Sequence, residues 1–199
     1  MMNNHPEDFV RSLYAEYLEL QMSLADYLPE KISNASQKLV DCLLQDGKIL
    51  ICGNGASSAN ALHFSTALIH QYKVERPALP VIVLSHDCTV LSTSANIGEY
   101  AHVFSRQIQA LGSDNDLLLI LTTNGDSNSL IHAVDTARER GMEVIVLNGH
   151  HGGALSNHLG PRDLEIQVAI PYAARIREIH LFILHCFCEL IDNALFGTT

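Results

Sequence analysis

Lys48-Ile-Leu-Ile-Cys-Gly-Asn-Gly-Ala-Ser-Ser-Ala-Asn-Ala-Leu-His63 is the stretch of this 199-residue chain that decides its fold. It begins as a short apolar run, turns at two glycines and two serines, and continues with the spacing of a helix. Glycines let the backbone turn sharply and approach a ligand closely, and the following helix directs its first free N–H groups at the same point. The stretch therefore predicts a strand, an anion-binding loop and a helix in succession.

Four more apolar runs follow, and helical segments alternate with them. Because each run is continuously apolar, we expect strands that are covered on both faces, and the helices between them imply a parallel sheet. We predict an α/β fold: a three-layer α/β/α sandwich with a five-stranded parallel sheet. The expected strands are Ile49–Cys52, Val81–Leu84, Leu117–Leu121, Val144–Leu147 and Leu164–Val168.

Residues 7–45 precede the sheet pattern and have the period of two helices, with a break at Pro29. Apolar positions continue around several sides of the first helix. This indicates burial on more than one side, either against another subunit or against the chain's own core. We expect one domain over residues 1–199, in which residues 1–46 are helical and contribute to oligomer packing, and residues 47–196 form the core.

Composition and charge exclude several classes of protein. The net charge is −10 with only 12 Lys and Arg, so we expect no direct binding to nucleic acid. The longest apolar run is far shorter than the about 20 residues of a membrane span, so we expect no membrane segment. Residues 1–8 lack the pattern of a secretory signal, which predicts a cytoplasmic protein. The five cysteines contain no Cys-x-x-Cys pair and are expected to be reduced thiols.

The first loop does not match the common nucleotide-binding motifs. Gly53-x-Gly55 is followed by Ser58 instead of a third glycine or alanine, and no acidic residue ends the next strand before Ser85. A P-loop would need Gly-Lys-Ser/Thr, which is absent from this loop. The loop therefore predicts an anion site of another kind.

A second hydroxyl-rich loop, Thr122-Thr-Asn-Gly-Asp-Ser-Asn-Ser129, follows the third expected strand. Ligands of open parallel sheets bind at the carboxyl ends of the strands, where both loops fall. Two such loops can converge on one phosphate with neutral donors alone, although helix capping also explains each single hydroxyl. Together the loops favour a ligand the size of a phosphorylated sugar.

Five motifs, spread over most of the chain, carry a resemblance to a known family. With them the chain resembles the sugar isomerase (SIS) domain family, in particular its phosphoheptose isomerase branch. The motifs are Cys52-Gly-Asn-Gly-Ala-Ser57, Ala61-Leu-His-Phe64, Glu75-Arg-Pro-Ala-Leu-Pro80, Thr122-Thr-Asn-Gly-Asp-Ser127 and Ala174-Arg-Ile-Arg-Glu-Ile-His180. The resemblance implies an SIS fold whose two loops hold a sugar phosphate. The implied contacts are Asn54, Gly55, Ser57, Asn96, Thr122, Thr123, Asn124 and Ser127.

The catalytic set of the isomerases is incomplete in this sequence. The resembling enzymes use a glutamate and a histidine, and these two hold a zinc ion with a second histidine and a glutamine. The histidines correspond to His63 and His185, but the glutamate is Ala67 and the glutamine is Arg177. Alanine has no metal ligand or exchangeable proton, and a permanent cation repels zinc. We predict no catalytic residue, no metal site and no cofactor, with His63 and His185 as remnants.

Two of these positions have alternative interpretations. Arg177 can pair with a phosphate or a partner's carboxylate, or it can form a structural ion pair. We interpret His180 as a core or rim histidine that is satisfied by the backbone. An enzymatic alternative for the whole chain is a phosphoheptose isomerase that converts sedoheptulose 7-phosphate to D-glycero-D-manno-heptose 7-phosphate and requires zinc.

The resemblance extends to non-catalytic members of the branch that bind the replication initiator DnaA and promote its assembly at the chromosomal origin. The shared features include Gly160-Pro-Arg-Asp163 and the ending Cys188-Glu-Leu-Ile-Asp-Asn-Ala-Leu-Phe196. They imply a homotetrameric adaptor whose repeated weak contacts add through effective concentration. Leu195 and Phe196 are the implied contact with DnaA. Apolar residues near a chain end are often exposed, although this helix end can also pack on the core.

Overall fold

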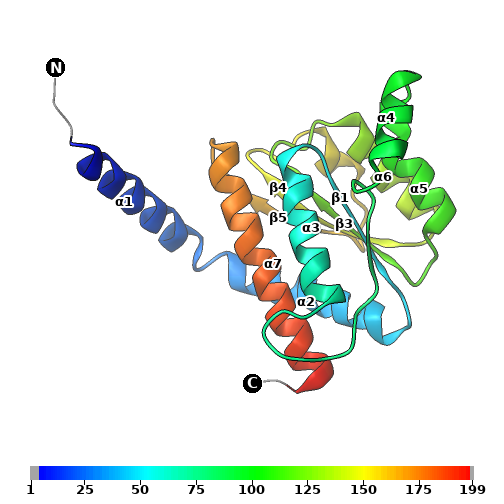
Figure 1. Cartoon of the computed structure of the whole chain (residues 1–199), viewed down its shortest axis with the longest axis horizontal. Coiled ribbons are helices and arrows are strands. Elements are labelled where there is room, and N and C mark those ends of the chain that lie inside the picture. Colours follow the sequence, from blue (N-terminus) through cyan, green and yellow to red (C-terminus); the bar gives the residue numbers. More distant parts are fainter. Residues whose placement is uncertain (1–4, 198–199) are drawn as a thin grey trace.

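The computed structural model describes residues 5–197 as one α/β sandwich from which the first helix projects (Figure 1). Residues 1–4, which begin the segment that lacks a secretory pattern, lie outside the described residues. The sheet is parallel throughout and has the strand order β2-β1-β3-β4-β5. The strands are β1 (Ile49–Gly53), β2 (Val81–Val83), β3 (Leu117–Leu121), β4 (Glu143–Gly149) and β5 (Leu164–Val168).

The five predicted strands and the three-layer architecture are confirmed. Only the strand ends differ. β4 extends beyond the expected Leu147 because Asn148 and Gly149 continue the pairing with β5 up to Val168. This extension places an amide side chain, Asn148, at the edge of the sheet where the loops lie.

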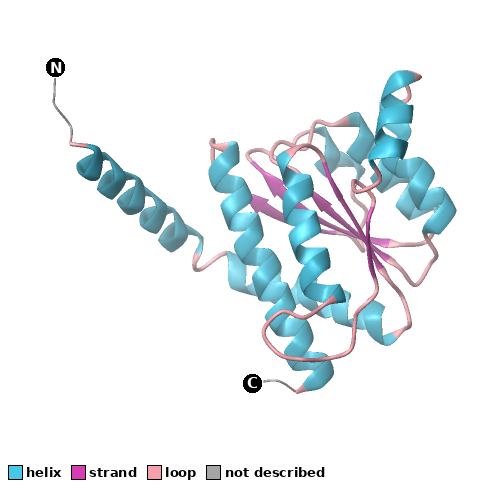
Figure 2. Ribbon diagram, viewed as in Figure 1, coloured by secondary structure: helices cyan, strands magenta, loops and turns pink. Residues whose placement is uncertain are grey.

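Helices cover both faces of the sheet (Figure 2). One face carries α2 (Leu28–Leu44), α3 (Ala56–Ile69) and α7 (Ala173–Phe196). The other carries α4 (Cys88–Asn96), α5 (Val103–Leu111), α6 (Asn128–Glu139) and the 3-10 helices η1 (Tyr100–His102) and η2 (Ala154–His158).

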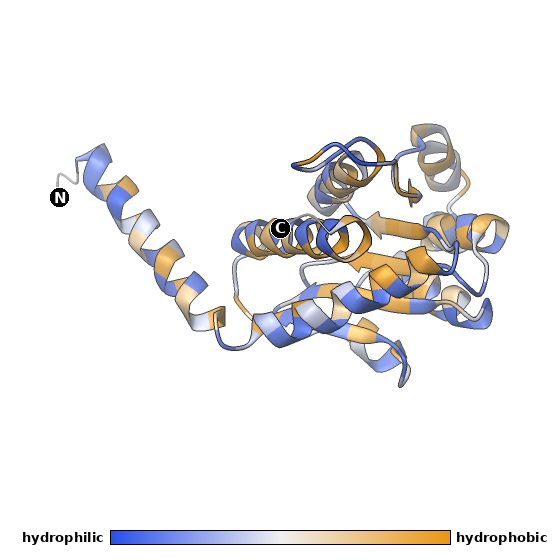
Figure 3. Ribbon diagram, turned by 90° about the horizontal axis from the view of Figure 1, so that it is seen from below, coloured by the Kyte–Doolittle hydropathy of each residue, from blue (hydrophilic) through white to orange (hydrophobic). Residues whose placement is uncertain are grey.

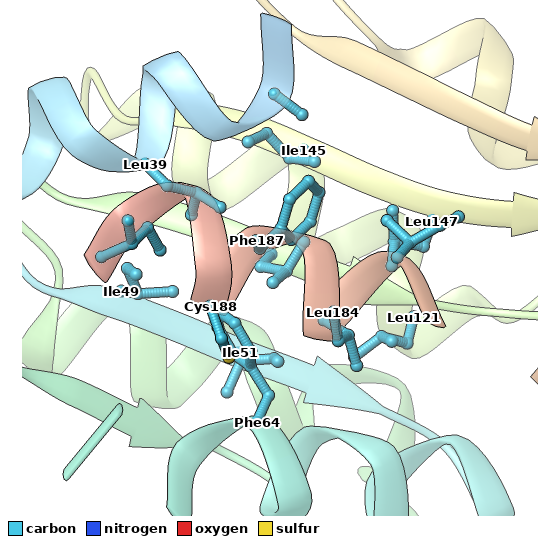
Figure 4. Packing of buried hydrophobic residues seen from close by; sticks show 14 of the residues in the cluster. Leu39, Ile49, Ile51, Phe64, Leu121, Ile145, Leu147, Leu184, Phe187 and Cys188 are labelled. Carbon is cyan, nitrogen blue, oxygen red and sulfur yellow. The ribbon is translucent and has the colours of Figure 1, made fainter. Parts of the chain in front are cut away.

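The alternation of side chains along β3 explains why its sequence is apolar throughout. Leu117 and Leu119 belong to the cluster under α2, α3 and α7, whereas Leu118 and Ile120 belong to the cluster on the opposite face. Figure 4 shows the first cluster, to which Phe187 of α7 and Phe64 of α3 belong, and the two rings meet edge to face. Each fully buried side chain of this size contributes roughly 1.5–3 kcal/mol. α7 is thereby a core helix, although its length and apolar composition alone would also suit a membrane span.

α1 (Pro6–Leu24) corrects two expectations about the N-terminal helices. The break lies at residues 25–27, and Pro29 stands in the first turn of α2, where its missing N–H leaves no intrahelical bond unmade. α1 has no buried residue, and of its residues Leu24 at the end is partly buried against the core cluster, so the helix as a whole does not pack on the chain's own core. Figure 3 shows apolar positions along α1, away from the sandwich. Burial against another subunit stays a prediction.

The five cysteines are free thiols, as the sequence predicted. Burial raises the pKa of the Cys42 thiol to about 11, with a further increase from the charge of Asp116. Burial likewise raises the pKa of Cys188 to about 12. These thiols are protonated at neutral pH and pack as small apolar side chains.

Candidate anion-binding site

The two hydroxyl-rich loops meet at the carboxyl ends of β1 and β3. Gly53 and Leu121 are paired in register, so the residues that follow them start side by side. The Asn54 amide Nδ2 then donates hydrogen bonds to the Oγ atoms of Ser127 (2.8 Å) and Ser129 (3.0 Å). The structure therefore brings together the two loops that the sequence singled out.

Two glycines allow this close approach. A Cβ atom on Gly53 would lie 2.8 Å from the Leu121 carbonyl oxygen, which is closer than packed atoms allow. Gly125 in the second loop has φ +69°, and a Cβ atom there would collide with the carbonyl oxygen of Gly152. Backbone segments therefore pack directly against each other at Gly53 and Gly125, and any side chain at these two positions would prevent this packing.

Both loops open onto helix N-termini that lack a side-chain cap. Gly55 precedes α3 and Ser127 precedes α6, and neither makes a capping hydrogen bond. Ser127 instead shares its hydroxyl with Ser129 at 3.0 Å, so helix capping does not explain it. Two uncapped N-termini with their positive dipole ends favour an anion at this edge.

The other predicted loop residues differ in exposure. Ser57 and Thr122 are buried, and the Thr122 hydroxyl accepts a hydrogen bond from the Gly125 N–H at 3.2 Å. Thr123 is half-buried and Asn124 is exposed. These four positions surround the two helix starts at different depths.

The side chains of Asn96 and Asp126 make no hydrogen bond to other residues of the two loops. Asn96 is exposed at the end of α4, and its side chain makes no hydrogen bond to any described residue. The Asp126 carboxylate accepts a hydrogen bond from the Ala154 N–H at 3.1 Å, at the start of η2. Its negative charge is thereby partly compensated within the protein.

Sequence reasoning missed two members of the site. Ser129 is buried and bonded to Asn54, and the hydroxyl-rich run in which it stands was the available signal. The Tyr100 hydroxyl donates to Asn54 Oδ1 at 3.2 Å from the 3-10 helix η1. No local pattern indicates Tyr100, because only the packing of η1 brings it to the loop.

A buried network supports the second loop from behind. Asn148 Nδ2 donates to the Gly152 carbonyl and to Glu165 Oε1, both at 2.7 Å. The His180 Nε2 atom bonds the Asn148 carbonyl at 3.1 Å, and burial lowers the pKa of His180 to about 4. His180 is therefore neutral and donates from Nε2 to the backbone, as expected for a core histidine, but its buried Nδ1 atom has no hydrogen-bond partner among the described residues. The Leu155 N–H donates to the Gly125 carbonyl at 2.9 Å and ties this region to the loop.

His63 and His185 face one another across α3 and α7. Their Nε2 atoms are 2.8 Å apart, so one ring donates a hydrogen bond and the other accepts it. Burial and the neighbouring His63 lower the pKa of His185. A catalytic zinc site uses three protein ligands, and residues 5–197 hold no group of three His, Cys, Asp or Glu side chains suited to a metal. The residues present do not fit the zinc ion of the isomerases.

The end of α7 packs back onto the core. Leu195 and Phe196 are half-buried against the cluster under α2, α3 and α7. The Phe196 ring lies 5.9 Å from the guanidinium carbon of Arg76, and Arg76 Nε forms a buried ion pair with Asp192 at 2.8 Å. The helix end is thus held in place with part of both apolar side chains accessible. Their contact with a partner stays a prediction.

Comparisons with known proteins agree with the observed fold. A sequence profile of the SIS domain matches residues 13–149. The DnaA initiator-associating protein DiaA of Citrobacter koseri is 41% identical over 189 residues, which cover 95% of this chain and 96% of that protein.

Solved structures of similar fold include two phosphoheptose isomerases. The enzyme from Francisella tularensis has a TM-score of 0.90 and 37% identity, covering 95% of this chain and 99% of its own. GmhA from Neisseria gonorrhoeae has a TM-score of 0.88 and 35% identity, covering 95% of this chain and 100% of its own. The match therefore extends over both whole chains.

Proposed function

Because this chain belongs to the SIS domain family, we propose that it is a non-catalytic SIS protein that associates with the replication initiator DnaA and promotes its assembly at the chromosomal origin. The observation that carries the proposal is the 41% identity to a DnaA initiator-associating protein over nearly the full length of both chains. A match of this extent includes the loops, the core and the C-terminal helix.

The residues around His63 support the absence of catalysis. Aldose–ketose isomerisation needs a general base that moves a proton between neighbouring carbons. Ala67 stands one turn after His63, is buried, and offers only a methyl group. His63 and His185 are bonded to each other, and no carboxylate joins them among residues 5–197.

The adaptor acts as a homotetramer in the cytoplasm. The exposed apolar positions of α1 support assembly with further copies of the chain. Several copies of one contact surface strengthen a weak interaction through effective concentration. The net charge of −10 suits a partner that carries a basic DNA-binding region, so the adaptor itself needs no contact with nucleic acid.

The loop site serves as a regulatory site for a sugar phosphate. Its support is the pair of uncapped helix N-termini around Asn54 and Ser127. The neutral donors of this site hold a phosphate without zinc or another cofactor.

Capture of purified DnaA by the immobilised protein tests the proposal. The variant Leu195→Ala/Phe196→Ala is expected to lose at least about ten-fold in captured DnaA, because truncating central apolar contacts costs more than about 1 kcal/mol each. Leu190→Ala, at an exposed position of the same helix, is the matched control and retains capture.

A second variant separates contact from folding. Ala194 is exposed beside the pair, so Ala194→Arg obstructs the surface without removing core packing. It is expected to reduce capture while the unfolding temperature is unchanged. No capture of DnaA by the wild type would contradict the proposed partner, and equal capture by all variants would contradict the Leu195–Phe196 contact.

A phosphoheptose isomerase is the second candidate, favoured by the TM-score of 0.90 to the Francisella tularensis enzyme. The wild-type protein with zinc and sedoheptulose 7-phosphate is the direct assay. We expect no formation of heptose phosphate above the buffer rate. Turnover at an ordinary isomerase rate would establish the second candidate and remove the non-catalytic assignment.

A further inference from the structure

We infer that an apolar notch between α1 and α7 receives α1 of a second copy of this chain, and that the same notch of the second copy receives α1 of the first. The notch is the space that Leu24 of α1, Ile32 of α2 and Phe182 of α7 line together with their neighbours. The inference rests on the homotetramer proposed above and names the surface that joins two of its subunits.

The notch has apolar walls and two adjoining parts. The part between α1, α2 and α7 has a volume of about 580 Å³, and the part between α1 and the first turns of α7 has about 280 Å³. The parts adjoin because Gln21 Nε2 in the first donates a hydrogen bond to Tyr17 Oη in the second at 2.7 Å. Apolar walls offer water few hydrogen-bond partners, so this space favours the side chains of another segment.

A row of apolar side chains follows the side of α1 that borders the notch. Its members recur at steps of three and four residues, which is the a/d spacing of helices that pack along one another. Of this row, only Leu24 packs against the core cluster. The row consists of Val10, Leu13, Tyr17, Leu20 and Leu24. α1 therefore has the pattern of a packed helix along a stretch where its own chain supplies little to pack against.

The exposed apolar surface of α1 and of the notch is as large as a protein interface. The exposed fractions are 56% for Phe9, 69% for Tyr14, 58% for Leu18, 76% for Met22, 47% for Phe182 and 38% for Leu190. At about 200 Å² for a full side chain of this size, these six expose roughly 700 Å². The largest apolar patch of a typical monomer is about 300–600 Å², and each partner of a stable complex buries about 800 Å².

A second copy of the chain is the occupant because one molecule presents both halves of the contact. α1 is a helix of 19 residues without a buried side chain, and it leaves the sandwich on the side of α7, beside the unfilled notch (Figure 1). Two copies related by a twofold axis bury both α1 helices and both notches at once, and such a contact closes on itself. A different protein in the notch would leave α1 exposed.

The charges of these helices suit a protein contact better than a lipid surface. α1 carries four acidic residues and a single basic one, Arg11. Helices that lie on membranes carry Lys and Arg on their polar face instead. The two carboxylates that border the notch are already paired, Glu178 with Arg175 and Glu189 with Lys73. An acidic helix therefore meets no uncompensated carboxylate of α7 there.

The mass of the assembly tests the notch from its α7 side. Phe182→Glu places a carboxylate in the apolar space without changing α1, and we expect the mass in light scattering after size-exclusion chromatography to fall at least about two-fold. Ile69→Glu changes an exposed isoleucine at the end of α3, outside the lining of the notch, and is the matched control that keeps the wild-type mass. Circular dichroism verifies that both variants are folded.

Two native thiols report whether the notch is covered. Cys186 lines the notch, whereas Cys88 is exposed at the start of α4. Labelling with N-ethylmaleimide, followed by mass spectrometry of the peptides, compares the wild type with Tyr14→Glu/Leu18→Glu, which changes α1 alone. Cys186 is expected to react at least about ten-fold more slowly in the wild type, because a covered group reacts only when the contact opens. Cys88 is the internal control and reacts at the same rate in both proteins.

The outcomes separate this inference from the function proposed above. An unchanged mass of Phe182→Glu, a fall in mass that Ile69→Glu shares, or equal labelling of Cys186 in both proteins overturns the notch contact and leaves the homotetramer standing. A monomeric wild type overturns both the inference and the homotetramer, while capture of DnaA tests that partner independently. Loss of DnaA capture by Phe182→Glu at unchanged mass assigns the notch to DnaA, and flotation of the wild type with anionic lipid vesicles assigns it to a membrane. Either result also overturns the inference.

Discussion

At the scale of single residues, the ion pair of Arg76 and Asp192 joins three parts of the chain. Arg76 donates to the carbonyl oxygens of Ala67 at 2.8 Å and of Leu68 at the end of α3, and to Asp192 on α7. Both charged side chains are almost completely buried. The arginine thus supplies partners to the Ala67 carbonyl and to a buried carboxylate, and adds a second hydrogen bond to the Leu68 carbonyl, which also accepts one from the Leu79 N–H.

Asp192→Asn removes the negative charge and keeps the shape of the side chain. Breaking a buried pair leaves an uncompensated charge, and we expect a loss of about 3–5 kcal/mol in the free energy of unfolding. Urea denaturation followed by circular dichroism measures it. Glu189→Gln, in the exposed pair with Lys73, is the control and should cost no more than about 1 kcal/mol. If the two variants lost similar amounts of unfolding free energy, the buried ion pair would not contribute more to stability than the exposed pair.

His180 makes the stability depend on pH. Its pKa is about 4 in the folded protein, because burial penalises the charged ring, and about 6.5 in an unfolded chain. Above pH 6.5 both states are neutral and the full stability is present. As the pH falls from 6.5 toward 4, only the unfolded state takes up the proton, and up to about 3 kcal/mol is lost.

His180→Gln is expected to flatten this part of the stability profile. Glutamine keeps a donor for the Asn148 carbonyl without a titrating ring. Chemical denaturation of both proteins at pH 4.5, 5.5 and 6.5 provides the comparison. Parallel profiles for wild type and variant would show that other groups cause the pH dependence.

At the scale of elements, each candidate loop is a unit of strand, turn and helix start. The sequence predicted both units because buried strands of a parallel sheet are read as continuous apolar runs, and glycine and hydroxyl residues mark the turns. It did not predict that the turn between β4 and η2 packs against the second loop. That contact joins Gly125 and Gly152, which are far apart along the chain.

Gly125→Ala is expected to cost about 3 kcal/mol or more in the free energy of unfolding. The new methyl group would meet the Gly152 carbonyl, and the positive φ adds strain of its own. Gly55→Ala is the matched control, since Gly55 also has a positive φ but open space around its Cβ position, and should cost about 1 kcal/mol. Thermal and urea unfolding distinguish the two values. A cost for Gly125→Ala no larger than that for Gly55→Ala would mean that the two loops do not press together.

At the scale of the whole molecule, the apolar side chains of α1 lack a packing partner within a single chain. It has no buried residue, and Phe9, Tyr14, Leu18 and Met22 are exposed along it. Isolated helices of this length are only marginally stable in water, so tertiary or quaternary packing has to support them. The homotetramer proposed above supplies that packing.

Tyr14→Glu/Leu18→Glu is expected to convert the tetramer into smaller species, because each interface would then bury an unpaired carboxylate. Light scattering after size-exclusion chromatography gives the mass. Glu19→Gln, an exposed polar change on the same helix, should leave the tetramer intact. An unchanged mass for the double variant would exclude α1 as the contact between subunits.

The sandwich, the five strands and the two loops were predictable from the sequence alone. Each of these depends on residue type and local spacing, which can be recognised in the sequence. It placed the helix break a few residues too late, at Pro29, because proline is as compatible with the first turn of a helix as with a break.

How these parts meet became visible in the folded structure alone. The bond from Tyr100 to Asn54, the network of Asn148 and His180, and the packing of Phe196 over Arg76 join segments that no local pattern relates. Such contacts depend on the simultaneous packing of distant elements around one core, and side-chain partners follow from that packing rather than from sequence spacing.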